Sequence, residues 1–515
     1  MSYFSTMAEA MEQVGPRFNF GPFAEILGPL IEEVVEEKGL TKFRKGTILL
    51  PKLLIWLILA LSIRRDLSYH KVLNWMVSGF RWLDGILPAL NKIVSDGAMS
   101  HARVKLGFEV LERLFVKLVG SFKKIEPDFQ GYVSVAFDGT TGTMPDSEAN
   151  QKKFTKPKSG RKEAAFPQIR LVSLLAVSVR LVLDVAYGSY TGKGTGERIL
   201  MGQIIERLPK EAFLFLLDAG LFAFEILWGI DDKKQKFLVK VPRTVKLKGL
   251  KTLADGSYLA QMNGKIIDPH QPKTKDGRNR WKKVSMIVRV IDYAIPGFRP
   301  AQLMTNILAP DITARELALH YHQRWDIEIA YDEIKTHQCA TLRGQSPTTF
   351  RSKRPDLVIQ ELYALLIMYN LVRLLIVQAA SAHGQDPRFI SFLDALQHII
   401  DAAPLMTVAK AEQRQKQFTY LLALLANSSI DRPRRPRINP RVVKVTSSKF
   451  KRKRKEHTSQ LRNLEKDLKI ISPPPDKPTA LIIQVLEPDT TNDLISLIII
   501  SILAIITSSS SDALL

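Results

Sequence analysis

The stretch that decides the fold is residues 321–335, which read Tyr-His-Gln-Arg-Trp-Asp-Ile-Glu-Ile-Ala-Tyr-Asp-Glu-Ile-Lys. It has no glycine or proline, and its apolar residues recur at spacings of three and four, which predicts an amphipathic helix. At about 100° per residue, four polar side chains fall within an arc of roughly 60°: Tyr321, Arg324, Glu328 and Lys335. Such charges more often mark a solvated face with ion pairs. Trp325 is unusual on such a face, so this stretch alone leaves both interpretations open.

An apolar strand that runs into an aspartate next to a glycine occurs twice in the sequence. Residues 132–137 lead into Asp138, and residues 212–217 lead into Asp218. The second run is almost continuously apolar, which predicts a central, buried strand. An aspartate after a strand is also ordinary turn chemistry, so neither residue establishes a site by itself.

The two aspartates and Glu328 together form a set of three carboxylates. Three ionised carboxylates repel one another strongly when they converge, unless divalent cations neutralise them. Oxygen ligands suit Mg²⁺ or Mn²⁺. Two such ions about 4 Å apart activate a water or a 3′-hydroxyl and stabilise the leaving oxygen of a phosphodiester.

The composition is strongly basic, with 74 Lys and Arg against 51 Asp and Glu in 515 residues and a formal net charge of +23. This bias predicts a polyanionic partner, either nucleic acid or an anionic membrane surface. The single cysteine, Cys339, excludes an internal disulfide framework and a cysteine-based zinc site, and indicates a reducing compartment. Residues 1–17 lack the pattern of a secretory signal. The apolar run 49–63 is short for a bilayer span and is interpreted as a buried core helix.

The first part of the chain reads as helices, with candidates at residues 23–37, 49–63, 68–77 and 97–119. Basic residues punctuate this region: Arg64, Arg65, Arg81, His101, Arg103 and Lys105. A helical bundle that contacts DNA and an ordinary helical domain with solvated basic residues are equally compatible with this pattern.

A strand-rich part follows. Residues 169–177 and 179–186 predict neighbouring antiparallel strands, and residues 197–208 predict a helix. Further short strands are expected at 236–241, 258–262 and 284–293, whereas the polar segment 150–162 is expected to be a mobile loop. The glycines within 192–196 lack the Lys-Ser/Thr ending of a phosphate-binding loop.

These features resemble the DDE transposases of the insertion sequence family numbered four. The helix signature of that family is Tyr, two residues, Arg, three residues, Glu, six residues, Lys, and the chain matches it at all four positions of residues 321–335. Asp138 in Phe-Asp-Gly-Thr-Thr matches the first acidic motif, and Asp218 in Leu-Leu-Asp-Ala-Gly-Leu-Phe matches the second. Ala219 departs from the basic residue that is common there. Residues 95–107, 166–172 and 360–373 extend the resemblance, which covers roughly residues 20–450.

The resemblance implies an α+β fold. An RNase H-like catalytic core, a mixed sheet with flanking helices, would be interrupted by a β-rich insertion and preceded by an all-helical N-terminal domain. The expected boundaries are a helical domain at 1–125, a core at 130–225 and 305–430, an insertion at 226–304, a basic segment at 431–470 and an atypical, poorly ordered tail at 471–515.

The resemblance also implies roles for individual residues. Asp138, Asp218 and Glu328 would be catalytic and would hold two Mg²⁺ ions, with Mn²⁺ as the alternative. Arg324 and Lys335 would hold phosphates near the scissile bond. The remaining DNA-binding candidates are Tyr321, which would contact a phosphate, and Trp325, which would stack on a base or belong to the core. Trp281, within the basic segment 278–283, carries the same two alternatives.

The activity implied is cut-and-paste transposition of an insertion sequence. The enzyme would bind terminal inverted repeats, nick them by hydrolysis and join the freed 3′ ends to target DNA. It would act as a homodimer in the synaptic complex, in the bacterial cytoplasm at the nucleoid, without membrane contact. Two alternatives are a DNA-binding protein that retains the fold but does not transpose, and a two-metal nuclease. The nuclease is disfavoured by the Arg324 and Lys335 pair and the long insertion.

The C-terminal part changes composition sharply. Residues 404–426 read as a last helical segment, and half of residues 432–455 are Lys or Arg with no acidic residue, which suits contact with a phosphate backbone. The apolar run 494–506 is too short to span a bilayer. It is interpreted as a non-homologous extension, with a packing or oligomerisation strand as the alternative.

Overall fold

The structure is a computed structural model that describes residue 14 and residues 17–41, 49–83, 94–122 and 125–472. Within the last range, the following residues are not described: 160–161, 193, 209–211, 269–270, 273, 275, 277–278, 297, 342–343, 346–347, 431–436, 439–459 and 462. The chain divides into two compact units, Met1–Pro473 and Pro474–Leu515, and every described residue belongs to the first. The apolar run 494–506 and nearly all of the basic block 432–455 therefore lie outside the described residues.

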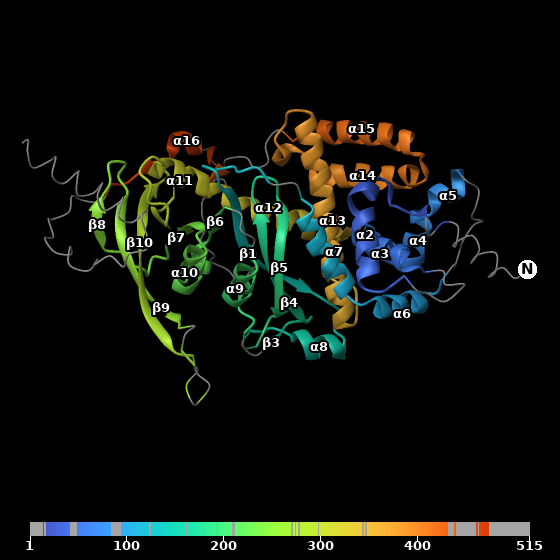
Figure 1. Cartoon of the computed structure of the whole chain (residues 1–515), viewed down its shortest axis with the longest axis horizontal. Coiled ribbons are helices and arrows are strands. Elements are labelled where there is room, and N and C mark those ends of the chain that lie inside the picture. Colours follow the sequence, from blue (N-terminus) through green and yellow to red (C-terminus); the bar gives the residue numbers. More distant parts are fainter. Residues whose placement is uncertain are drawn as a thin grey trace, which may run out of the picture. The chain divides into compact units, whose positions relative to one another are not determined.

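One large mixed sheet forms the centre of the described chain (Figure 1). Its strand order is β5 (Leu181–Ser189), β4 (Gln168–Ala176), β1 (Val133–Thr143), β6 (Phe213–Leu217), β7 (Lys236–Lys240), β11 (Ala301–Thr305), β10 (Trp281–Ala294), β9 (Tyr258–Ile267) and β8 (Gly249–Thr252), and β16 (Lys469–Ile470) pairs with β10. β1, β6 and β7 are parallel, and the other pairs are antiparallel. The expected α+β fold with a mixed sheet is confirmed, and strands β8 to β11 extend the same sheet.

Alternation along the central strands separates two hydrophobic cores. Ala136 of β1 and Leu216 of β6 belong to the core shared with the long helices, whereas Phe137 and Phe215 belong to the core shared with α9 (Glu197–Glu206) and α10 (Phe224–Asp232). Since successive side chains of a strand point to opposite faces, residues 138 and 218 fall on the face of Ala136 and Leu216.

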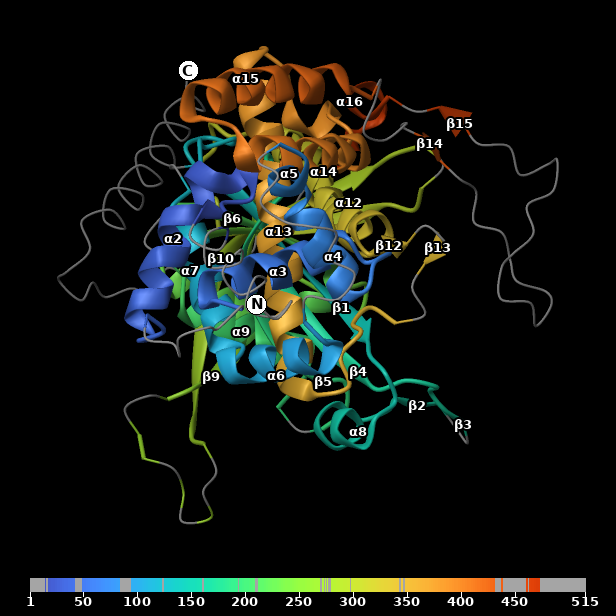
Figure 2. The same ribbon diagram turned by 90° about the vertical axis from the view of Figure 1, so that its right-hand side faces the viewer.

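The helical part combines both ends of the described chain (Figure 2). From the N-terminal side it contains α2 (Ala24–Glu37), α3 (Pro51–Ile63), α4 (Tyr69–Met76), α5 (Ser78–Leu83), α6 (Asp96–Leu106) and α7 (Glu109–Gly120), and from the C-terminal side α13 (Pro355–Ala382), α14 (Phe392–Val408) and α15 (Ala411–Asn427). α3 packs on α13 and is buried from Leu53 onward, so the interpretation of residues 49–63 as a core helix is confirmed. Among the described residues, α13 alone is long and apolar enough to cross a membrane, and 83% of the qualifying window is buried inside the structure.

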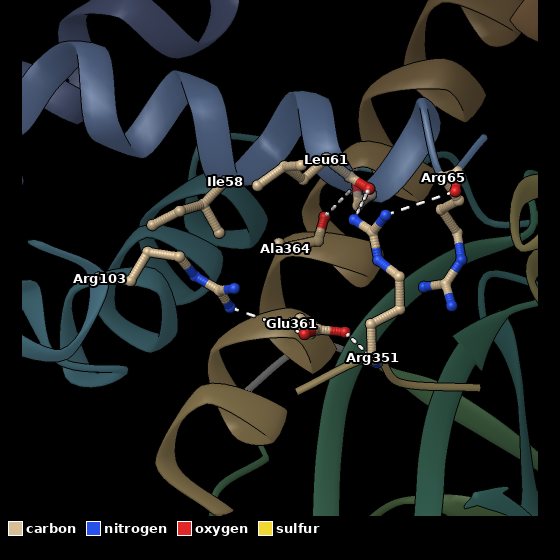
Figure 3. A pocket seen from close by; sticks show the side chains of 8 residues that line it. Ile58, Leu61, Arg65, Arg103, Arg351, Glu361 and Ala364 are labelled. Atoms are coloured by element: carbon tan, nitrogen blue, oxygen red, sulfur yellow. Dashed lines mark hydrogen bonds and ion pairs between the residues drawn. The ribbon is translucent and has the colours of Figure 1, made fainter. Parts of the chain in front are cut away.

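Three arginines connect α3 and α6 to α13 and to the segment that precedes it (Figure 3). Arg103 donates from Nε to Gln360 Oε1 at 2.8 Å, and Arg351 donates from Nη2 to the carbonyl of Leu61 at 3.0 Å. Arg65 donates to the carbonyl of Thr349 at 2.7 Å. Arg65 and Arg103, two of the basic residues considered for DNA contact, are 6% and 1% exposed and serve this internal junction.

Three local expectations were wrong. Residues 97–119 form two helices because Gly107, with φ of +81°, ends α6 in a conformation that favours glycine. The segment 150–162 is not a mobile loop, because it contains most of α8 (Glu148–Phe154) and the hairpin of β2 (Lys158–Ser159) and β3 (Lys162–Glu163). Residues 404–426 are not one helix, because α14 ends at Val408 and α15 begins at Ala411.

Candidate active site

The parallel pairing of β1 and β6 brings the two aspartates to the same level. The register pairs Ala136 with Leu216 at its last position, and Asp138 and Asp218 each follow two residues later. Neighbouring strands lie about 4.8 Å apart, so the two residues leave adjacent strands side by side. Both fall on the face of the sheet that Ala136 and Leu216 share with the long helices.

Strand β1 does not end at Asp138, which corrects the expected strand-to-turn geometry. β6 ends at Leu217, whereas β1 continues to Thr143 because β4 pairs with it from Val135 to Thr143. Asp138 therefore lies where β1 keeps its antiparallel neighbour and loses its parallel one. Gly139 serves close packing instead of a turn, since a Cβ there would lie 2.6 Å from Cδ of Glu197.

The signature stretch forms the predicted helix, but two of its turns depart from regular α geometry. α11 (Ala314–Tyr321) begins with a capping box formed by Thr313 and Glu316. A 3₁₀ turn (His322–Trp325), α12 (Asp326–Asp332) and a π-helical turn (Glu333–Gln338) follow. Local interruptions of this kind are frequent at functional sites.

Three side chains of this segment bond to the strands that carry the aspartates. The hydroxyl of Tyr321 donates to the carbonyl of Leu217 at 3.0 Å, and the hydroxyl of Tyr331 donates to the carbonyl of Asp138 at 2.7 Å. Lys335 Nζ donates to Thr140 Oγ1 at 3.0 Å. The segment therefore lies beside the end of β6 and the part of β1 around Asp138, with both aspartates next to it.

Arg324 is the cation shared by the three predicted carboxylates. Its Nη2 lies 3.2 Å from Glu328 Oε1, and its charge also acts on Asp138 and Asp218. Burial disfavours the charged guanidinium, but Tyr321, Asp218 and Glu328 outweigh that cost and raise the pKa of Arg324. The guanidinium therefore stays charged and partly offsets three negative groups.

Asp138 is held in a form that resists ionisation. Burial raises the pKa of its carboxyl to about 6, against the opposing effects of the Gly139 N–H, which donates to Oδ1 at 2.8 Å, and of Arg324. The charges of Glu328 and Glu197 raise this pKa further. Burial is therefore the main obstacle to ionising Asp138, and the two neighbouring carboxylates add to it.

The donor chemistry fits a hard divalent cation, because the three predicted ligands supply only carboxylate oxygens and their charges converge on one region. Among the described residues, however, no group of three or more His, Cys, Asp or Glu side chains is close enough together to hold a metal ion. The charge of Arg324 acts on all three carboxylates, so a bound ion would share these carboxylates with Arg324.

The two tryptophan candidates are both exposed, which excludes the core alternative for each. Trp325 is 40% exposed, and Cζ of Arg324 lies 5.0 Å from the centroid of its ring. Trp281, at the first position of β10, is 54% exposed and pairs with Ile267, the last residue of β9.

No pattern in the sequence indicated that Glu197, the first residue of α9, lies at the candidate site. Its side chain lies over Gly139, next to Asp138, and Arg170 Nε approaches its Oε1 to 4.0 Å. Only the folded chain brings it there, because 57 residues lie between Gly139 and Glu197 in the sequence.

Comparisons with known proteins agree with this geometry. Residues 130–371 match the family described as Transposase DDE domain, and residues 17–116 match the family described as Insertion element 4 transposase N-terminal. The match to the DDE domain thus defines a nucleic-acid-processing enzyme of the DDE transposase class, and that class generally uses divalent metal ions.

The chain belongs to the insertion sequence 4 family of these enzymes and is an insertion-sequence transposase that acts on DNA. It is 26% identical over 430 residues to transposase InsG for insertion sequence element IS4 of Escherichia coli (strain K12), which covers 82% of this chain and 91% of that protein. A solved chain from a piggyBac transposase synaptic complex with hairpin DNA is 10% identical, with a TM-score of 0.38 over 79% of this chain and 84% of the other.

Proposed function

We propose that this transposase moves its insertion sequence by a cut-and-paste route. It binds the terminal inverted repeats, hydrolyses a phosphodiester at each end and joins the freed 3′ end to target DNA. The observation that most supports this reaction is the β1–β6 register, which brings Asp138 and Asp218 to one level beside the helix of Glu328.

In this proposal Asp138, Asp218 and Glu328 hold two Mg²⁺ ions, and Mn²⁺ can replace them. When bound, the ions supply an activated nucleophile and charge stabilisation at the leaving oxygen. The raised pKa of Asp138 supports the assignment, because a bound cation would offset the cost of burying its carboxylate. Arg324 limits the mutual repulsion of the three carboxylates before the ions arrive.

The phosphate-binding group consists of Arg324, Lys335 and Tyr321. Lys335 is exposed at Thr140 of β1, two residues after Asp138, so its ammonium meets the DNA backbone beside the reacting phosphate. Tyr321 is 4% exposed and its hydroxyl donates to Leu217, so it acts on the phosphate chiefly by holding the end of β6. Trp325, exposed next to Arg324, offers a ring on which a base can stack.

The partners proposed are double-stranded terminal repeats and target DNA, bound by a homodimer in the synaptic complex. The net charge of +23 supports a polyanionic partner. We assign residues 1–125 to DNA contact, 130–225 and 305–430 to the catalytic core, 226–304 to the β-rich insertion and 431–470 to backbone binding. The expected tail at 471–515 lies almost entirely outside the described residues. The working location would be the bacterial cytoplasm, at the nucleoid.

The test is strand cleavage of labelled duplexes that carry the element's own terminal repeats, with the full chain and Mg²⁺. Glu328→Gln removes one ligand charge while keeping the side chain's size. We expect cleavage to fall at least about a thousandfold, or about 4 kcal/mol, with end binding retained. The matched control is Asp332→Asn, an exposed carboxylate four residues along the same helix, which should cleave like the parent. Parent-like cleavage by Glu328→Gln would overturn the assignment.

A DNA-binding protein that does not transpose is the second candidate. One observation favours it: among the described residues no metal-ready cluster of acidic side chains is preformed. It would be supported if the parent bound the terminal repeats yet cut no strand with either Mg²⁺ or Mn²⁺.

A further inference from the structure

Arg180 is buried at an unusual backbone position, in the turn that joins β4 to β5. Its φ is +55°, a left-handed conformation that glycine adopts without strain and that costs other residues on the order of 1 kcal/mol. The side chain is only 2% exposed. Strain of this kind persists where surrounding contacts over-determine the residue, so the contacts of Arg180 are the place to look for its role.

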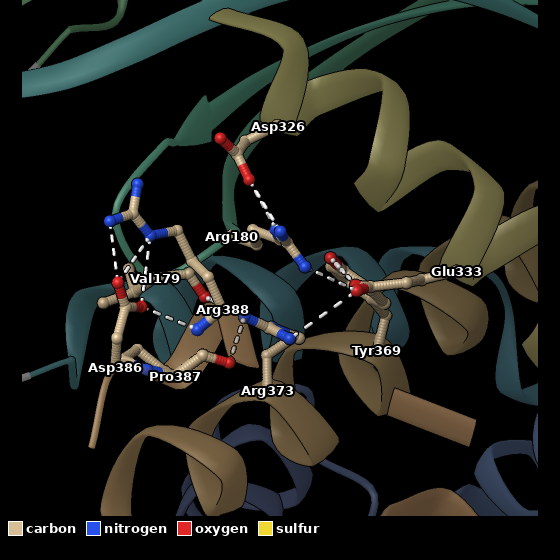
Figure 4. Close-up of polar contacts among 9 residues, drawn as sticks. All are labelled: Val179, Arg180, Asp326, Glu333, Tyr369, Arg373, Asp386, Pro387 and Arg388. Carbon is tan, nitrogen blue, oxygen red and sulfur yellow. Dashed lines mark hydrogen bonds and ion pairs between the residues drawn. The ribbon is translucent and has the colours of Figure 1, made fainter. Parts of the chain in front are cut away.

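The guanidinium of Arg180 donates hydrogen bonds to two carboxylates of the signature helix (Figure 4). Its Nε and Nη2 donate to Asp326 Oδ1 at 2.9 and 2.7 Å, and its Nη1 donates to Glu333 Oε1 at 3.0 Å. Burial disfavours the charged form, yet Glu333 and Asp326 outweigh that cost and raise the pKa of Arg180. The guanidinium of Arg180 is therefore charged although it is buried.

The two carboxylates that Arg180 contacts, Asp326 and Glu333, lie at the two ends of α12. Asp326 is its first residue, directly after the 3₁₀ turn, and Glu333 begins the π-helical turn directly after its last. Seven residues make about two turns, so Asp326 and Glu333 face the same side, whereas Glu328 lies about 200° from Asp326. Arg180 thus holds the side of α12 opposite to Glu328.

Helix α13 contacts both Glu333 and the turn that carries Arg180. Tyr369 of α13 donates its hydroxyl to Glu333 Oε2 at 2.9 Å, and Arg373 Nη1 approaches Glu333 Oε1 to 3.6 Å. Arg373 also donates to the carbonyl of Val179, next to Arg180. Asn370 of α13 pairs with both the N–H and the carbonyl of Val182 in β5, at 2.9 and 2.8 Å.

The β4–β5 hairpin belongs to the sheet that carries Asp138. β4 pairs with β1, and Asp138 lies opposite Ser173 in that register. β4 and Arg180 therefore connect the strand of Asp138 to the rear of α12, in addition to the hydroxyl of Tyr331 in α12 that donates to the carbonyl of Asp138.

We propose that Arg180 is a positioning residue that sets the distance from Glu328 to Asp138, and hence the spacing of the metal ligands. The proposal rests on the function proposed above. It assigns to Arg180, Asp326 and Glu333 a part in metal affinity and strand cleavage although none of them touches DNA or metal. A buried ion pair can often be replaced by apolar side chains without loss of stability, so stability and position are separable here.

The test uses Arg180→Met/Asp326→Leu, which removes the pair without leaving an unpaired buried charge, and Arg180→Lys, which keeps the charge but loses the planar fork. Glu333 keeps Tyr369 and Arg373 in both. We measure the melting temperature, binding of the terminal repeats, cleavage against Mg²⁺ concentration, and Mn²⁺ binding without DNA by electron paramagnetic resonance. The matched control is Arg207→Met/Asp184→Leu, which removes a two-bond ion pair between β5 and the end of α9, away from α12.

We expect both Arg180 variants to bind the repeats like the parent, to cleave at least tenfold more slowly at fixed Mg²⁺, and to bind Mn²⁺ at least fivefold more weakly. The control pair should cleave like the parent. Parent-like cleavage and Mn²⁺ binding in either Arg180 variant would overturn the proposal, as would a loss that follows the melting temperature alone. If Glu328→Gln also cleaves normally, the proposed function itself fails; if only the Arg180 variants do, the positioning role fails alone.

Discussion

The carboxylates on the two sides of α12 differ in how many hydrogen-bonding and cationic partners they have. On the rear side, Asp326 and Glu333 receive hydrogen bonds from Arg180 and Tyr369, with Arg373 close by. On the front side, which faces Asp138 and Asp218, the guanidinium of Arg324 acts on both of these carboxylates and on Glu328.

The difference separates a structural charge cluster from a reactive one. Buried charges are tolerated when they are paired and hydrogen-bonded, as those of the rear side are. On the front side, burial, with smaller contributions from Glu328 and Glu197, raises the pKa of Asp138 to about 6 against the opposing effect of Arg324. Ionising this buried carboxylate lowers stability in the absence of a cation, and a bound cation would offset that cost.

The largest expected effect is on the rear side. Glu333→Ala leaves Arg180 and Arg373 without their shared carboxylate, so the free energy of unfolding should fall by about 3–5 kcal/mol. Urea denaturation followed by circular dichroism measures it. The exposed Asp332→Asn on the same helix serves as the control and should change it by less than about 0.5 kcal/mol. A Glu333→Ala variant as stable as this control would contradict the rear-side description.

The front side should respond in the opposite direction. The ordinary pKa of Asp138 is 3.8 and the folded value is about 6, so the folded state binds more protons between these values and loses stability as pH rises through that window. Asp138→Asn should therefore stabilise the metal-free protein by up to about 3 kcal/mol at pH 8, and the gain should vanish near pH 4. Urea midpoints at both pH values test this. A variant less stable than the parent at pH 8 would show that the carboxylate is well compensated.

The smallest effect concerns the exposed ring beside the front side. Trp325→Ala should weaken binding of the terminal repeats by about 1 kcal/mol, or roughly fivefold, through lost stacking. Because the side chain is 40% exposed, stability should barely change. Fluorescence anisotropy with labelled repeats gives the affinity, and Tyr420→Ala, at a residue 68% exposed on α15, is the control. Unchanged affinity with a lower melting temperature would assign the ring to packing.

The sequence predicted what local patterns encode. The strand that leads into Asp218 is a continuous apolar run, the strand that leads into Asp138 is largely apolar, and the core helix α3 is apolar on nearly every side, so each was found from residue order alone. The signature spacing also placed Glu328 on the segment that the structure brings to the aspartates.

Tertiary contacts set the features that the sequence did not reveal. β1 continues past Asp138 because β4 pairs with it, and the signature helix departs from regular α geometry where a side chain 146 residues upstream grips Asp326. Nothing near Val179 marks Arg180 as a partner of that helix. Glu197 likewise reaches Gly139 only after the sheet and α9 have packed.

The most direct measurement is iron-directed scission of the polypeptide. Fe²⁺ replaces Mg²⁺ in the full chain, and ascorbate with peroxide generates hydroxyl radicals at the bound ion. Scission should concentrate next to Asp138, Asp218 and Glu328, should be suppressed by excess Mg²⁺, and should disappear in Glu328→Gln. Scission elsewhere in the chain, or an unchanged pattern in Glu328→Gln, would contradict a metal site built from these three carboxylates.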